Sequence, residues 1–159
     1  MLSTPHITHS PAQTTAVIRL TIPRAEIRTV MGPGIAELMQ TVAAQGITPV
    51  GPWFTHHLRM TPDVFDFEIG VPTDRPVKPA GRVEPGALPE ATVARVVHEG
   101  SYEELGAAWG EFSAWIAAEG HKPAADLWER YVVGPESGDD VAAYRTELNQ
   151  PLVAQDEAA

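Results

Sequence analysis

The chain has 159 residues, 43% of them apolar, which suits one domain or two tightly fused halves with a sizeable core. It contains no cysteine, which excludes disulfides, thiol catalysis and thiolate metal sites. Its 11 Lys and Arg against 21 Asp and Glu give a net charge of −10, the wrong sign for a surface that meets phosphate backbones, so we expect no nucleic-acid partner.

The two ends of the chain have the composition of disordered segments. Residues 1–13 are polar and proline-bearing and lack the layout of a secretory signal, and residues 153–159 form a polar tail. The ordered domain is therefore expected over residues 14–152. No run in it reaches the roughly 20 apolar residues of a membrane span, so we expect a cytoplasmic protein with no membrane partner.

The first half of the domain has the order strand, helix, strand, strand. Alternating apolar and polar residues predict a strand at 14–22, followed by a second extended piece at 25–30. Glycine and proline at 32–34 indicate a turn. Apolar residues then recur at helical spacing up to a glycine cap: Ile35, Leu38, Met39, Val42 and Gly46. Two more strands are predicted at 52–60 and 64–72.

The second half repeats this order after a proline-rich connector at residues 75–90. A strand is predicted at 92–100, and Ser101 with Glu104 forms a capping box that starts a helix. The helix carries one apolar stripe and ends at a glycine: Leu105, Ala108, Trp109, Phe112, Ile116 and Gly120. Two strands at 126–133 and 141–148 complete the copy.

Local motifs support an internal duplication with halves at about 14–74 and 90–152. The segment AAQGITP in the first half matches AAEGHKP in the second, which aligns Pro49 with Pro123 and Thr55 with Glu129. Two small copies cannot each bury a sheet face alone, so we expect them to pair. The predicted fold is α+β: a pseudo-twofold duplication whose antiparallel sheet has both helices on one face.

A candidate site is predicted on the other face of this sheet. If the Phe65 and Phe67 face packs on the helices, Asp66 and Glu68 face an opposite groove, and the repeat places Glu129 there too. Alternation within residues 126–133 puts Tyr131 beside Glu129. A carboxylate walled by aromatic rings is partly desolvated, which raises its pKa and suits it to bind a cation or exchange a proton. The candidate ligand-binding residues are Glu129, Tyr131, Trp53, Glu68, Trp109, His57 and Thr55.

Structural roles compete with these assignments. Trp109 lies in the apolar stripe of its helix and serves equally well as a core residue, and Glu68 serves equally well as a solvated residue. A register slip of one position would move Trp53 and Tyr131 into the core. His56 and His57 are adjacent in a strand and point to opposite faces, so they cannot easily chelate together, and we expect no metal and no cofactor.

Several motifs, taken in order, resemble the GyrI-like, or bacterial transcription-activator effector-binding, domain. They are VMGPG, VGPWF, FDFEIGVP, HEGSYEELGAAWGEF, WERYVVGP and YRTELNQPL, and the resemblance covers about residues 14–152. It implies a pseudo-twofold α+β domain with a small-molecule groove on the sheet face away from the helices. In multidrug-sensing regulators such domains follow a DNA-binding module and meet lipophilic cations with a glutamate among aromatics. Only about a dozen residues precede the first predicted strand, so a stand-alone member is expected.

Three functions remain open from the sequence. The first is a stand-alone domain that binds amphipathic small molecules, cationic ones included, around a central glutamate. The second is a hydrolase of reactive, cyclopropane-type natural products, with Glu129 as general acid or base and Tyr131 stabilising charge. The third is a protein-directed inhibitor of the gyrase-inhibitor type. The sequence does not identify the ligand, the oligomeric state or whether residues 75–90 form a lid.

Overall fold

A computed structural model describes residues 2–60, 63–134, 138 and 140–153. The chain divides into two compact units. Unit 1 comprises Met1–Ser10 and Ala91–Ala159, and unit 2 comprises Pro11–Glu90. Within the described residues, neither long helix is apolar enough over a sufficient length to cross a membrane.

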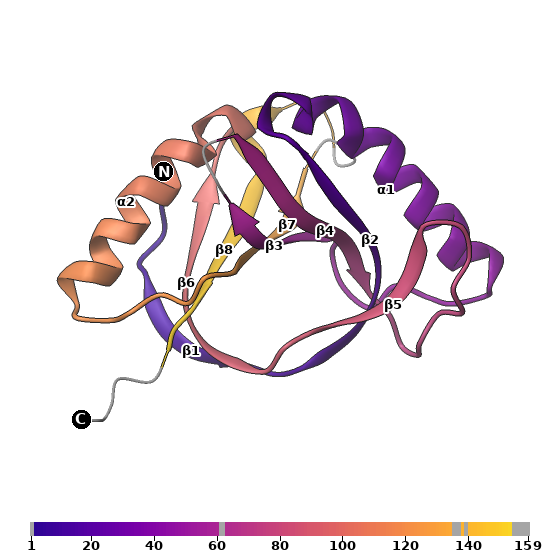
Figure 1. Ribbon diagram of the computed structural model, residues 1–159. Helices are drawn as coiled ribbons and strands as arrows, with labels where there is room; N and C mark the ends of the chain where they lie inside the picture. Colours follow the sequence, from indigo (N-terminus) through magenta and orange to yellow (C-terminus); the bar gives the residue numbers. More distant parts are fainter. Residues whose placement is uncertain (1, 61–62, 135–137, 139, 154–159) are drawn as a thin grey trace. The chain divides into compact units, whose positions relative to one another are not determined.

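Unit 2 contains a four-stranded antiparallel sheet with one long helix. Along the chain its elements are β2 (Gln13–Pro23), the 3-10 turn η1 (Arg24–Glu26), α1 (Ile27–Ala44), β3 (Phe54–Met60), β4 (Val64–Pro72) and β5 (Val83–Leu88). The strand order is β3-β4-β2-β5. In Figure 1, α1 runs along the face of this sheet near β2 and β5.

Unit 1 has the same design. Its elements are β1 (His6–Ser10), β6 (Ala91–Glu99), η2 (Tyr102–Glu104), α2 (Leu105–Ala118), β7 (Leu127–Val133), η4 (Val141–Ala143) and β8 (Arg145–Pro151). The strand order is β1-β6-β8-β7, again antiparallel, and α2 packs against the sheet beside β6 (Figure 1).

The two units confirm the predicted duplication and the α+β class. Strand for strand, β7-β8-β6-β1 corresponds to β3-β4-β2-β5. Gly46 and Gly120 follow the two helices with φ angles of 68° and 79°, the left-handed conformation that ends a helix without steric cost to glycine. The correspondence includes an irregular position in each unit. The register of β3 shifts just after His57, and that of β7 shifts just after Tyr131.

The expectation that residues 1–13 are disordered is wrong. β1 pairs with β6 over five residues, from His6 opposite Arg95 to Ser10 opposite Ala91. The Ser3 amide also donates to the Val97 carbonyl at 2.9 Å. A polar segment is stable here because pairing satisfies the outer backbone groups of β6, which needs no apolar side chains. Residues 154–159 of the predicted C-terminal tail lie outside the described residues.

The first helix begins earlier than the sequence suggests. The piece at 25–30, predicted to be extended, belongs to η1 and α1, and the helix continues through Pro33. The reason is a longer apolar stripe on α1 that packs against the core of unit 2: Ile27, Val30, Met31, Ile35 and Met39. Its burial outweighs the local helix-breaking tendency of the glycines and the proline at 32–34.

Three smaller expectations also change. The connector at 75–90 contains β5, which pairs with β2 and forms the edge of the sheet in unit 2. The last strand begins at Arg145, because residues 141–143 form the turn η4. The Ser101 side chain makes no capping bond, and the Glu104 amide instead donates to the Ser101 carbonyl at 3.2 Å.

Each helix buries its stripe against the sheet of its own unit. In unit 2, Leu38 and Val42 are fully buried against strand residues such as Ile18 and Ile69. In unit 1, Phe112 is fully buried in a cluster that consists of Ala94, Val96, Ala108, Phe112, Ile116 and Leu148. Leu105, at the start of the same stripe, is only partly buried.

The predicted core stripe can be tested at Phe112. Phe112→Ala should lower the free energy of unfolding by about 3–5 kcal/mol, because it removes a buried ring and leaves a cavity. Chemical denaturation measures this change, and Glu111→Ala, at the exposed neighbouring position, is the control. Equal unfolding midpoints for the two variants would show that the stripe is not the core.

A second prediction concerns His57, which is buried in unit 2 with its ring stacked on Phe67 at 5.2 Å. Burial, and then the charges of His56 and Arg24, lower its pKa from 6.5 to about 4. Between these values the unfolded chain binds more protons than the folded one, so stability falls as the pH falls. From pH 7 to pH 5 the loss through this residue should be about 2 kcal/mol.

The measurement compares urea denaturation at the two pH values for the wild type and His57→Phe, which keeps an aromatic ring in the stack. The variant should lose about 2 kcal/mol less than the wild type over this interval. His6→Gln, at an exposed position, should behave as the wild type does. A variant with the full wild-type pH dependence would exclude His57 as the source.

Candidate functional site

Glu129 lies in the middle of β7 and is only 8% exposed. Both of its carboxylate oxygens accept hydrogen bonds from aromatic side chains. The indole Nε1 of Trp109 donates to Oε2 at 2.6 Å, and the hydroxyl of Tyr131 donates to Oε1 at 2.5 Å. The structure therefore brings together three of the residues selected from the sequence, around one buried carboxyl group.

Strand register and helix packing explain why these residues meet. Glu129 pairs with Leu148 on β8, and Leu148 pairs with Val96 on β6. Because directly opposed residues project to the same face, all three face α2, whose residue Phe112 packs with Leu148 and Val96. Trp109, half-buried on α2, spans the gap from the helix to the strand.

The face predicted for Glu129 was wrong. It was expected on the sheet face opposite the helix, in the same setting as Asp66 and Glu68. In unit 2, Glu68 pairs with Arg19 while its neighbours Phe67 and Ile69 face α1, so Glu68 does lie on the face away from the helix of its unit. The error arose because Glu129 corresponds in the repeat to Thr55, which pairs with Ile69 on the helix-facing side.

Burial raises the pKa of the Glu129 carboxyl above its ordinary value of 4.5. The hydrogen bonds from Tyr131 and Trp109 and the charge of His98 act in the opposite direction, and desolvation outweighs them. The two donors keep the carboxylate usable as an anion in a mostly dry place. A group in this condition can attract a cation or exchange a proton with a ligand.

Further polar and aromatic side chains surround the carboxyl group in unit 1. His98, Thr146 and Tyr131 form one row across β6, β8 and β7, adjacent to the row that contains Glu129. The Tyr102 ring lies edge-on to Tyr131 with centroids 5.8 Å apart. Among the described residues, two fully buried polar atoms of this row have no hydrogen-bond partner: Nδ1 of His98 and Oγ1 of Thr146.

Sequence reasoning missed His98, Thr146 and Tyr102. A usable signal existed for His98, because it follows Ala94 and Val96 at every second position and so occupies a core-facing position of β6. A polar residue at a core-facing position is uncommon and therefore indicates a specific structural or functional role.

The remaining predicted residues belong to unit 2. Thr55 is fully buried, and His57 is buried between the rings of Phe65 and Phe67. Trp53 is partly buried against the core of that unit. Glu68, with its Oε1 3.8 Å from His56 Nδ1, lies on the other sheet face from Thr55 and His57. A role of these residues in ligand binding stays a prediction.

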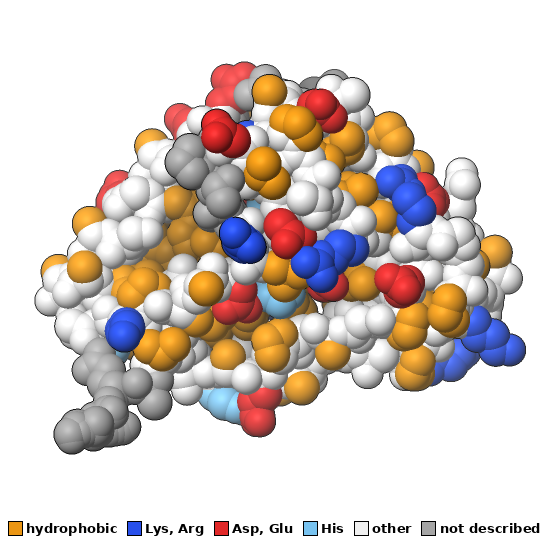
Figure 2. Space-filling model, viewed as in Figure 1, with side chains coloured by type: hydrophobic (Ala, Val, Ile, Leu, Met, Phe, Trp, Pro, Cys, Tyr) orange, Lys and Arg blue, Asp and Glu red, His pale blue; other side chains and the backbone are white. Residues whose placement is uncertain are grey.

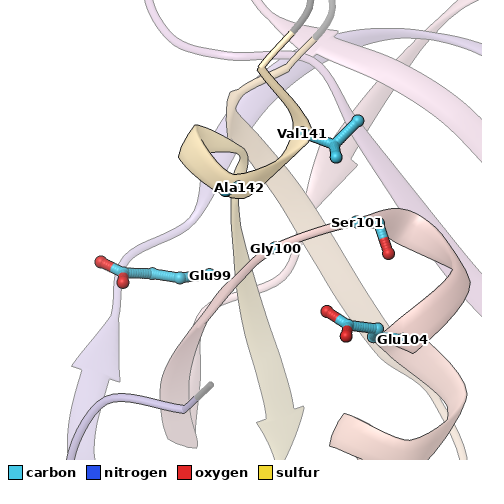
Figure 3. A pocket seen from close by; sticks show the side chains of 6 residues that line it. All are labelled: Glu99, Gly100, Ser101, Glu104, Val141 and Ala142. Carbon is cyan, nitrogen blue, oxygen red and sulfur yellow. The ribbon is translucent and has the colours of Figure 1, made fainter.

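A surface pocket of about 380 Å³ lies beside the start of η2. It is lined by Glu99, Gly100, Ser101, Glu104, Val141 and Ala142. Figure 3 shows the Glu99 side chain pointing away from those of Ser101 and Glu104. Oε1 of Glu104 lies 3.8 Å from His98 Nε2, so this pocket adjoins the imidazole of the buried row.

Among the described residues, charged groups elsewhere give no competing site. Within the described part of the chain, no group of three His, Asp or Glu side chains is placed to hold a metal ion. On the face in view in Figure 2, basic side chains occur in small separate groups among acidic and apolar ones.

The arrangement predicts an unusual effect of Glu129→Gln on stability. Glutamine can accept from Trp109 and donate to the Tyr131 hydroxyl, so no buried partner is lost. The folded state binds its extra proton above pH 4.5, which means that the wild-type carboxyl group destabilises the fold increasingly as pH rises through its raised pKa. Glu129→Gln should therefore equal the wild type near pH 4 and gain on it toward pH 7.

Urea denaturation at pH 4 and pH 7 measures this difference. Glu129→Ala, which leaves both donors without an acceptor, should be less stable than Glu129→Gln at either pH. A Glu129→Gln variant that loses stability relative to the wild type as pH rises would contradict the assigned burial.

Comparison with protein families and solved structures gives consistent results. The profile of one family, described as GyrI-like small molecule binding domain, matches residues 3–152. No curated protein sequence matches the chain significantly. The C-terminal domain of EcmrR superposes with a TM-score of 0.84 at 20% identity, covering 96% of this chain and 98% of that one.

Three further structures are informative. EcmrR in a complex with DNA superposes with a TM-score of 0.82 at 21% identity over 94% of this chain, which corresponds to 57% of that larger chain. SAV2435 bound to tetraphenylphosphonium has a TM-score of 0.66 at 13% identity, covering 95% of this chain and 94% of that one. A chain described as a hydrolase from Listeria innocua has a TM-score of 0.65 at 13% identity, covering 94% and 91%.

Proposed function

Because the chain belongs to the GyrI-like small molecule binding domain family, we propose that it binds amphipathic organic cations at Glu129. The observation that supports this most is a buried carboxylate held by the side chains of Trp109 and Tyr131. Aromatic faces attract a cation through their quadrupole, and the carboxylate supplies the countercharge. The net charge of −10 favours a cationic small molecule over a nucleic acid as the partner.

Desolvation explains the preference for lipophilic cations. A small ammonium or metal ion loses its hydration shell on entering a nearly dry site, and one carboxylate whose two oxygens already accept hydrogen bonds repays little of that cost. A bulky cation with delocalised charge is weakly hydrated and gains apolar contact with the rings. Tetraphenylphosphonium, which the solved structure of SAV2435 contains, has this chemistry and is a suitable probe.

Binding is tested by calorimetric titration of tetraphenylphosphonium. Glu129→Gln should weaken its affinity about 5- to 150-fold, the usual value of one partly desolvated charge contact. The neutral analogue triphenylphosphine oxide should bind both forms equally. The matched control is Glu119→Gln at the exposed end of α2, which removes a charge elsewhere. Equal affinities of the two variants would disprove the role of Glu129.

A hydrolase is the second candidate, supported by the Glu129–Tyr131 hydrogen bond of 2.5 Å. A carboxyl group with raised pKa next to a phenol can pass a proton to or from a strained, electrophilic substrate while water attacks it. No Ser-His-Asp or Cys-His constellation was found in the sequence, so the substrate itself must be reactive, as a cyclopropane is.

Turnover separates this candidate from simple binding. Mass spectrometry of a cyclopropane-bearing electrophile incubated with the protein would show addition of one water. In that case Glu129→Gln should keep substrate binding and lower turnover by about 10²–10⁴, the typical contribution of a general acid or base. Unchanged electrophile in the presence of the wild type would exclude the hydrolase for that substrate.

A further inference from the structure

His98 is the strongest feature of the molecule that the proposed binding site does not yet use. Its side chain is 2% exposed and faces the interior of unit 1 from β6. Nε2 lies 3.1 Å from the Ser101 carbonyl oxygen, and Nδ1 is buried with no hydrogen-bond partner among the described residues. A buried imidazole nitrogen without a partner is costly, so its retention calls for a functional explanation.

The hydrogen bond to Ser101 fixes how this imidazole can act. A carbonyl oxygen only accepts, so Nε2 must carry the hydrogen, and Nδ1 then has the free lone pair in the neutral ring. The next proton can therefore only be taken up at Nδ1. Protonation there places a positive charge in the row that contains Thr146 and Tyr131, one row from Glu129.

We propose that His98 sets the charge of the Glu129 site and competes, when protonated, with a cationic ligand. The neutral imidazole leaves the carboxylate available to the ligand. The imidazolium is an internal countercharge that makes the pair electrically neutral. His98 is thus a specificity-determining residue, and this inference rests on the proposed binding of cations at Glu129.

The groups that face His98 support this pairing. On β7 they are Glu129 and Tyr131, and on β8 the uncharged Thr146. From the η2 side, Glu104 Oε1 lies 3.8 Å from Nε2, and Leu2 of the N-terminal segment forms a bridge with His98. The Glu104 side chain is 61% exposed and screened by water, whereas Glu129 is 8% exposed. Both carboxylates therefore act on the imidazole, Glu104 from nearby and Glu129 through the drier interior, and the charge of His98 in turn lowers the pKa of Glu129.

The expected size of the coupling follows from strand spacing. β6 and β7 are separated by β8, which is about 10 Å across the sheet, and the offset of two residues between the rows adds about 7 Å along the strands, so the two Cα atoms lie about 12 Å apart. Unit charges at that separation with an effective dielectric constant of about 20 change a binding constant on the order of tenfold. By thermodynamic linkage, protonation of His98 weakens ligand binding by the same factor by which the bound ligand weakens proton binding at His98.

The test is an NMR titration of the imidazole C–H signals between pH 4.5 and 9, with His98→Gln used to assign the His98 signal. Glu129→Gln should lower the proton-binding constant of His98 about tenfold. Glu129→Asp, which keeps the charge, should restore most of it. His6, exposed on β1, is the internal reference and should not respond to either substitution.

The same titration with saturating tetraphenylphosphonium links the residue to binding. The cation should lower the proton-binding constant of His98 by a similar factor, and triphenylphosphine oxide should not. A His98 titration that is identical in the wild type and Glu129→Gln would overturn the proposal. If Glu129→Gln shifts His98 but the wild type binds no tetraphenylphosphonium, the coupled pair is supported and the proposed binding of that cation fails.

Discussion

The site depends on one contact between α2 and β7, the hydrogen bond from the side chain of Trp109 to that of Glu129. Trp109 reaches from the helix to Glu129, and its indole hydrogen together with the Tyr131 hydroxyl satisfies both oxygens of a carboxylate that water scarcely reaches. Without these donors the burial of Glu129 would cost several kcal/mol. The apolar stripe of α2 thus has two roles. Phe112 packs in the core of unit 1, and Trp109, three residues earlier, donates a hydrogen bond to the Glu129 carboxylate.

The duplication explains why only one unit carries this charge. The repeat aligns Glu129 with Thr55, Tyr131 with His57 and Trp109 with Ile35, and the matching register shifts in β3 and β7 support this alignment. In unit 2 the same positions are filled by apolar and uncharged groups, with His57 kept neutral between phenylalanine rings. Two copies of one scaffold have therefore diverged into a charged site and an uncharged aromatic cluster.

Sequence periodicity predicted the helices, most strands and the duplication, because these depend on local spacing and on burial. It failed where nonlocal pairing decides: β1 and β5 have no apolar alternation, and they form because the outer strands β6 and β2 offer unpaired backbone groups. The sequence did indicate Glu129 and Tyr131 as candidate site residues, since a carboxylate and an aromatic ring in one predicted strand are visible in the sequence. It did not indicate the sheet face on which Glu129 lies, because alternation shows which residues share a face and not which face the helix covers.

The buried row beside Glu129, which consists of His98, Thr146 and Tyr131, shows how a residue missed in the sequence can be recognised in the structure. Strand alternation alone marks His98 as core-facing. Its hydrogen bonds then distinguish it from a packed aromatic ring, because Nδ1 has no partner in the described part of the chain. Each carboxylate oxygen of Glu129 accepts a hydrogen bond, from Trp109 or Tyr131, whereas His98 Nδ1 and Thr146 Oγ1 have no partner among the described residues. A proton can be added at Nδ1 of His98 without breaking a hydrogen bond among the residues around it, because Nε2 already donates to the Ser101 carbonyl and the Nδ1 lone pair points into the buried row.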